Sequence, residues 1–85
     1  MDSTDILALR AALAALRKFG GDGLPKNNVL ALAEYDAGAL MSSAQREALW
    51  QTLVKRRYVA SYVMPVTNRE QWRITERGLE ALACL

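Results

Sequence analysis

The sequence predicts an α+β fold in which three helices are followed by a two-stranded antiparallel hairpin and a final helix. Of the 85 residues, 52% are apolar, and 14 Ala and 13 Leu supply most of this apolar content. Ala and Leu are among the residues that cost least in a helix. Only five Val and two Ile are present, so we expect any sheet to be small. This length fits one domain over residues 1–85.

The first helix is predicted over residues 3–19. Its apolar side chains recur at steps of three and four residues, which places them on one helix face. They are Ile6, Leu9, Leu13 and Leu16. The glycine-rich segment 20–23 follows, and a glycine just past a helix end takes the left-handed conformation at little cost. We therefore expect this segment to end the helix.

The second helix is predicted to open at Pro25. Proline suits the first helical turn, because the N–H that it lacks would have no partner there. A short apolar stripe follows and ends near Tyr35. The stripe consists of Val29, Leu30, Leu32 and Ala33. Residues 36–39 then read as a turn.

The third helix is predicted to start at a capping box and to run to about Arg57. Ser42 and Gln45 have the spacing at which each side chain bonds the backbone N–H of the other residue. At 100° per residue, one arc of this helix is apolar. That arc holds Leu49, Trp50, Leu53 and Val54. The opposite arc is polar or small, so we expect it to face solvent or a partner.

Aromatic and β-branched residues dominate segment 58–64, which predicts a strand. Pro65 ends this strand or lies at an edge, and 66–71 reads as a polar turn. Residues 72–74 alternate apolar, basic and apolar, as in a short returning strand with one face inward. Thr75 is expected to cap a last helix over 76–85. That helix is expected to bury Leu79 and Leu82.

Charge is distributed unevenly along the chain. Residues 1–41 hold four basic and five acidic side chains, a net charge of −1. Residues 42–85 hold seven basic and four acidic side chains, a net charge of +3. The basic excess therefore lies in the C-terminal half, and this asymmetry is more informative than the total of +2.

The composition also argues against several classes of protein. The chain has no His and one Cys, Cys84, whereas a zinc site needs several Cys or His ligands. His is also the commonest general base. We therefore expect no metal site, no cofactor and no enzyme activity.

The expected location is the cytoplasm. No stretch approaches the roughly 18 apolar residues that a membrane span requires. The acidic start of the chain is unlike a signal peptide, and a single Cys cannot form an internal disulfide.

One stretch carries a resemblance to a known family. Residues 72–82 read Trp-Arg-Ile-Thr-Glu-Arg-Gly-Leu-Glu-Ala-Leu. This resembles the aromatic-x-aliphatic-Thr-x-x-Gly-x-x-x-Leu pattern that closes the wing of winged helix-turn-helix DNA-binding domains and begins the next helix. Leu49 and Leu53, leading into segment 57–59, are similar to the end of the recognition helix in that family. The family commonly has Gly near Arg57 or Tyr58, and this chain has none there.

The resemblance implies a small transcriptional regulator that reads double-stranded DNA with its third helix and wing. A helix of this kind lies in the major groove. The implied base-edge contacts are Ser43, Gln45, Ala48, Gln51 and Thr52. The implied phosphate contacts are Arg46, Lys55 and Arg56 on the helix, and Arg69 and Arg73 in the wing. No small-molecule effector is evident in the sequence.

Two alternatives stay open at this point. A winged-helix protein–protein interaction module would use the same helix or wing to meet a protein, and the modest net charge favours it. Some site residues also have structural explanations. Cations near a helix C-terminus, such as Lys55 and Arg56, gain about 0.3–1 kcal/mol from the helix dipole. The capping box can occupy Gln45.

The first helix is predicted to contribute to a homodimer. Its alanines give it an apolar surface wider than one packing stripe needs, and small residues let another helix approach closely. We expect Ile6, Leu7 and Leu13 to lie at this contact, although Leu13 can equally pack inside the domain.

Overall fold

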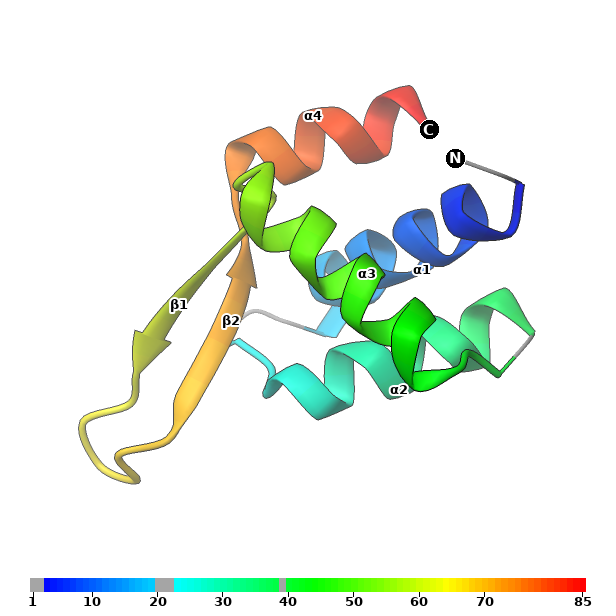
Figure 1. Cartoon of the computed structure of the whole chain (residues 1–85). Coiled ribbons are helices and arrows are strands. Elements are labelled where there is room, and N and C mark those ends of the chain that lie inside the picture. The colour runs from blue at the N-terminus through cyan, green and yellow to red at the C-terminus, as the bar shows by residue number, and fades with distance from the viewer. Residues whose placement is uncertain (1–2, 20–22, 39) are drawn as a thin grey trace.

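The computed structural model describes residues 3–19, 23–38 and 40–85 of the chain (Figure 1). The elements are α1 (Ser3–Phe19), α2 (Lys26–Ala37), α3 (Ser43–Lys55), β1 (Val59–Val63), β2 (Glu70–Ile74) and α4 (Glu76–Cys84). This order confirms the predicted fold class. The returning strand is longer than the sequence predicts, because β2 begins at Glu70 rather than at residue 72.

Helix α1 forms the centre of the core. In Figure 1 it runs behind α3, with α4 above it and α2 below it, and it contacts α2, α3, α4 and β2. Leu13 and Leu16 of α1 are almost completely buried, together with Val29 of α2 and Leu53 of α3. The predicted apolar faces of the first three helices therefore meet in one cluster.

The two strands form an antiparallel pair in which Val59 lies opposite Ile74 and Val63 opposite Glu70. On the other edge of β2, the backbone of Leu24 pairs with that of Trp72 through two hydrogen bonds of 2.9 and 2.8 Å. The Trp72 ring also meets the Trp50 ring of α3 edge-on, with centroids 4.8 Å apart. These contacts attach the hairpin to the helical core.

Several helix ends adopt the predicted local structure. The Ser42 hydroxyl accepts a hydrogen bond from the Gln45 N–H, and Gln45 Oε1 accepts one from the Ser42 N–H, so the capping box is present. Helix α2, by contrast, runs to Ala37, beyond its predicted end near Tyr35, and Gly38 follows it in the left-handed conformation with φ 72°. Of the glycine-rich segment 20–23, only Gly23 lies within the described residues.

The turn from α3 into β1 passes through Arg57, whose φ of 59° lies in the left-handed region. This is the place where winged helix domains commonly carry glycine, which adopts such a conformation without steric cost. The turn is closed by the Tyr58 N–H, which donates to the Leu53 carbonyl at 2.9 Å. This chain thus makes the same turn with an arginine.

Thr75 connects that turn to α4. Its hydroxyl caps α4 by accepting from the Gly78 N–H at 3.1 Å, and it donates to the Arg57 carbonyl at 2.6 Å. The Thr75 N–H donates to the Tyr58 carbonyl at 2.9 Å. Gly78 is buried against this junction, which explains physically why Thr and Gly stand three residues apart in the motif.

The predicted burial of Leu79 is wrong, because its side chain is 41% exposed. Val54, on the predicted apolar arc of α3, is 37% exposed. In α4, Gly78 is buried and Leu82 is half-buried against the core, which leaves Leu79 on the flank.

Over the described ranges, no helix is long and apolar enough to cross a membrane.

We expect Gly78→Ala to destabilise the domain by about 1–3 kcal/mol, the usual range for overpacking. A Cβ at this position would lie 2.5 Å from the Tyr58 carbonyl oxygen and 2.6 Å from Ile74 Cγ1. The first of these atoms belongs to the backbone and is held by Thr75. Urea unfolding measures the change.

The control for this substitution is Glu80→Ala, at an exposed position of the same helix, which we expect to change stability by less than about 0.5 kcal/mol. Because Ala is favoured over Gly in helices by about 1 kcal/mol, a Gly78→Ala variant that is more stable than the parent would contradict the close packing at this junction.

Candidate nucleic-acid interface

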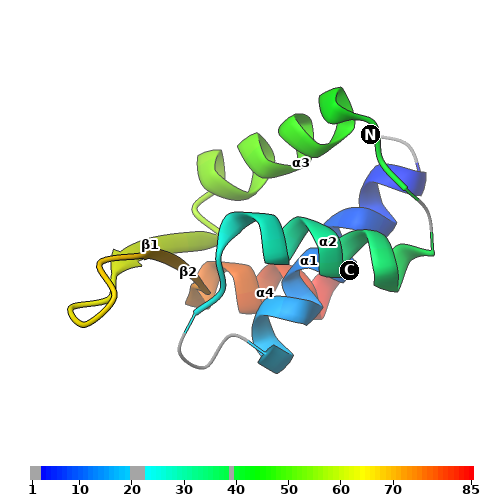
Figure 2. The same cartoon turned by 90° about the horizontal axis from the view of Figure 1, so that it is seen from below.

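The outward side of α3 is fixed by what its inward side buries. Leu49, Trp50 and Leu53 lie in the core. The residues on the opposite arc are all exposed. They are Ala44, Glu47, Ala48, Gln51 and Lys55. Figure 2 shows that α3 lies at one surface of the molecule, with the β1–β2 hairpin projecting beside its C-terminal end.

Two polar side chains of this outward arc, Glu47 and Gln51, are connected to Lys26 of α2. Gln51 Nε2 donates to Glu47 Oε1 at 2.9 Å. Lys26 of α2 places its Nζ 3.7 Å from Glu47 Oε2 and 5.4 Å from the centre of the Trp50 ring. The hydrogen bond from Gln51 and the charge of Lys26 lower the pKa of Glu47. Glu47 is therefore an ionised carboxylate at neutral pH.

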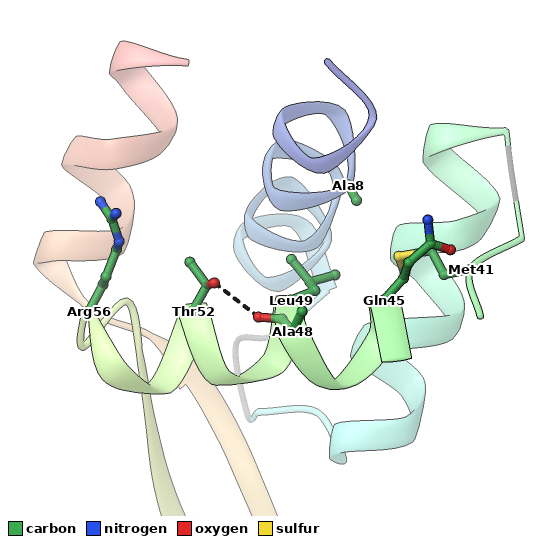
Figure 3. Close-up of a pocket in the computed structure, with 7 residues that line it drawn as sticks. All are labelled: Ala8, Met41, Gln45, Ala48, Leu49, Thr52 and Arg56. Atoms are coloured by element: carbon green, nitrogen blue, oxygen red, sulfur yellow. Dashed lines mark hydrogen bonds between the residues drawn. The ribbon is translucent and has the colours of Figure 1, made fainter. Parts of the chain in front are cut away.

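A shallow pocket of about 330 Å³ lies along the other flank of α3, between this helix and α1 (Figure 3). It is lined by Ala8, Met41, Gln45, Ala48, Leu49, Thr52 and Arg56. Three polar side chains lie on this flank rather than on the outward arc, namely Gln45, Thr52 and Arg56. The Thr52 hydroxyl donates to the Ala48 carbonyl at 2.9 Å.

The predicted base-edge residues therefore divide into two groups. Ala48 and Gln51 lie on the outward arc, and Ser43 is exposed in the first turn of α3. Gln45 and Thr52 lie on the pocket flank, and each already uses hydrogen-bonding capacity within the domain. The capping interaction foreseen for Gln45 is confirmed.

Arg46, a predicted phosphate contact, is paired with a carboxylate of the domain in the structure. Its Nε donates to Glu34 Oε1 at 2.6 Å, and its Nη2 bonds the same oxygen. The Glu34 carboxylate, 6% exposed, also accepts the Met41 N–H at 3.0 Å. This arrangement ties α2 to the start of α3 across the intervening turn. It leaves the Arg46 guanidinium committed to Glu34.

The wing arginines lie in different surroundings. Arg69 is exposed in the β1–β2 turn, and its carbonyl accepts the Met64 N–H at 3.0 Å. Arg73 stacks over the Tyr62 ring, 4.2 Å from its centre. Because neighbouring side chains of a strand point to opposite faces, Arg73 points away from the face on which Trp72 meets α3.

The predicted dimer residues also separate. Ile6 is 41% exposed and Leu7 is 53% exposed. Leu13 has no exposed surface, because it lies at the centre of the core. The prediction that Leu13 contacts a second subunit is wrong, and its alternative role inside the domain is the one that the structure shows.

Neither Glu47 nor Lys26 is among the site residues predicted from the sequence. The spacing of Glu47 and Gln51, four residues apart on the polar arc, is a signal that was available, since such residues face each other on a helix. Lys26 belongs to another helix, and its proximity to Glu47 depends on how α2 packs against α3.

The architecture is that of a winged helix domain. The structure is similar to a crystal structure of a mutant of MepR from a multidrug-resistant S. aureus clinical isolate, with a TM-score of 0.69 and 17% sequence identity. The match covers 89% of this chain and 51% of that one, so this chain spans about half the length of that protein. It shows the winged helix fold. No protein-family model and no curated protein matches the sequence.

We expect Glu34→Gln to lower stability at neutral pH, by an amount that shrinks as the pH falls. The Met41 N–H and the Arg46 guanidinium lower the pKa of Glu34 below the value of the unfolded chain. The ionised carboxylate therefore stabilises the fold above about pH 4.3, the ordinary pKa of Glu. This stabilisation is lost as the pH falls through the lower pKa of the folded state.

Thermal unfolding of the parent and the Glu34→Gln variant between pH 7 and pH 3 measures this convergence. Glu80→Gln, at an exposed position, is the control and should follow the parent. If the difference in melting temperature between Glu34→Gln and the parent stays constant with pH, the charge of Glu34 does not stabilise the α2–α3 turn.

Proposed function

We propose that this chain binds double-stranded DNA and acts as a transcriptional regulator, with α3 in the major groove. The observation that carries the proposal is the outward arc of α3. It is exposed along the whole helix, carries small and polar side chains, and is flanked by the projecting hairpin. Its 13 residues span about 20 Å, and the major groove, about 12 Å wide, admits an α-helix.

Within this interface we assign base-edge contacts to Ser43, Ala48 and Gln51. Ser and Gln can hydrogen-bond base edges, and an Ala methyl can contact the methyl group of thymine. Gln45 and Thr52 receive no such role, because they lie on the pocket flank of α3 rather than on its outward arc. Ala44 and Ala48 have short side chains, so the helix backbone can approach the bases closely.

Phosphate contacts are assigned to Lys55 and Arg56 at the end of α3 and to Arg69 in the hairpin turn. All three are exposed and appear in none of the ion pairs or cation–π contacts among the described residues. Arg46 and Arg73 are left out, since Glu34 and Tyr62 engage them. Phosphate contacts position a protein on the duplex and supply much of its salt-dependent affinity.

The likeness to the MepR structure concerns the arrangement of helices and strands. At 17% identity this likeness supports the proposal through the fold alone.

We also propose a homodimer through the exposed start of α1. Ile6 and Leu7 there are 41% and 53% exposed, and a dimer would place two copies of α3 on one duplex, as dimeric helix-turn-helix proteins do. Sedimentation equilibrium at high protein concentration tests this contact. A strict monomer would rule it out without affecting the proposed DNA surface.

We expect Lys55→Ala and Arg69→Ala each to weaken binding to random duplex DNA and to make it less dependent on salt. Each lost phosphate contact reduces the slope of log K against log salt by about 0.9. Fluorescence anisotropy at several salt concentrations measures the slope.

Arg17→Ala is the matched control, because it removes the same charge from the end of α1, on the side of the molecule away from α3 (Figure 2). It should leave the slope unchanged, as should Arg73→Ala. An equal loss in all four variants would indicate diffuse attraction rather than a defined interface.

A protein-interaction module is the second candidate, and specific exposed side chains favour it. Tyr35 is 82% exposed and Leu40 90% exposed around the α2–α3 turn, and Val66 in the hairpin turn is 94% exposed. No detectable binding to duplex DNA at about 50 mM salt, where even non-specific affinity is measurable, would favour this candidate over the regulator.

A further inference from the structure

Glu47 lies in the middle of the arc that we propose faces DNA. Ala44 is three residues before it and Ala48 directly follows it, so the large neighbour of Glu47 on that arc is Gln51, one turn further along. Its side chain is 58% exposed. A carboxylate in this position requires an explanation, because the phosphates of a duplex repel negative charge.

The Glu47 carboxylate is held in place rather than free to turn away. The Gln51 amide donates to Oε1 at 2.9 Å, and the Lys26 ammonium lies 3.7 Å from Oε2. These contacts come from two helices. They keep the ionised carboxylate on the outward arc and offset part of its charge.

An ionised carboxylate only accepts hydrogen bonds. In the major groove, donors are the amino groups of cytosine N4 and adenine N6, while guanine presents two acceptors and thymine one acceptor. Adenine also presents the N7 acceptor beside its amino group, which suits an amide better than a carboxylate. Cytosine is therefore the base whose edge fits Glu47.

We propose that Glu47 determines specificity by accepting a hydrogen bond from the N4 amino group of a cytosine in the site that α3 reads. Gln51 and Lys26 position this carboxylate. The inference rests on the proposed DNA binding and deepens it, because it names one base within the recognised sequence.

Selection of randomised duplexes by the parent protein and by Glu47→Gln tests the inference. The parent should select sites with one position at which cytosine is preferred, by between about fivefold and 150-fold, the range that one good base contact gives. Glu47→Gln adds a donor while keeping the shape of the side chain. It should lose the cytosine preference and favour adenine at that position, since Gln pairs with adenine.

Glu80→Gln, which removes a carboxylate from exposed α4, should select the same sites as the parent. If Glu47→Gln binds DNA and selects the same sites as the parent, Glu47 is not a determinant of specificity and the proposed DNA binding still stands. A parent without any base preference would also overturn the inference. If neither protein binds a duplex at low salt, the proposed function itself fails.

Discussion

Burial of one side of α3 orients this helix and, through Trp50, the hairpin beside it. Leu49, Trp50 and Leu53 must face the core, because exposing such side chains would forfeit roughly 1.5–3 kcal/mol for each aliphatic one. Since a helix rotates by about 100° per residue, this burial determines which side chains the opposite arc presents. The exposed row from Ala44 to Lys55 is thus a geometric consequence of the core, and the Trp50–Trp72 contact extends the same constraint to the hairpin.

Polar contacts then fix the two ends of α3. At its start, Glu34 binds the Met41 N–H and the Arg46 guanidinium. At its end, Thr75 bonds the carbonyl of Arg57 and caps α4 with the same hydroxyl. Both ties use side chains from other elements, so the angle of α3 does not depend on the helix alone. One of the basic side chains of α3, that of Arg46, thus forms an ion pair within the domain.

Local signals made much of this architecture predictable. The Ser42–Gln45 box, the Thr75 cap and the apolar spacing in α1 each act within one element, and the structure confirms them. What the sequence could not provide depends on packing between elements. The bridge to Trp72 uses only Leu24 from its segment, which is too short to form a strand pattern. Arg46 pairs with Glu34, twelve positions earlier in the chain. The face of Arg73 follows from the register of the two strands. For the same reason the sequence alone leaves Leu13 between a dimer contact and the core, and it does not single out Glu47.

If the outward arc of α3 and the hairpin turn contact one duplex together, as we propose, amide chemical shifts of the isotope-labelled protein will show it during titration with duplex DNA. We expect the largest changes on residues 43–56 and on the turn between β1 and β2, and no change at the end of α1. Changes concentrated around Tyr35 and Leu40, or spread evenly over the molecule, would contradict the proposal.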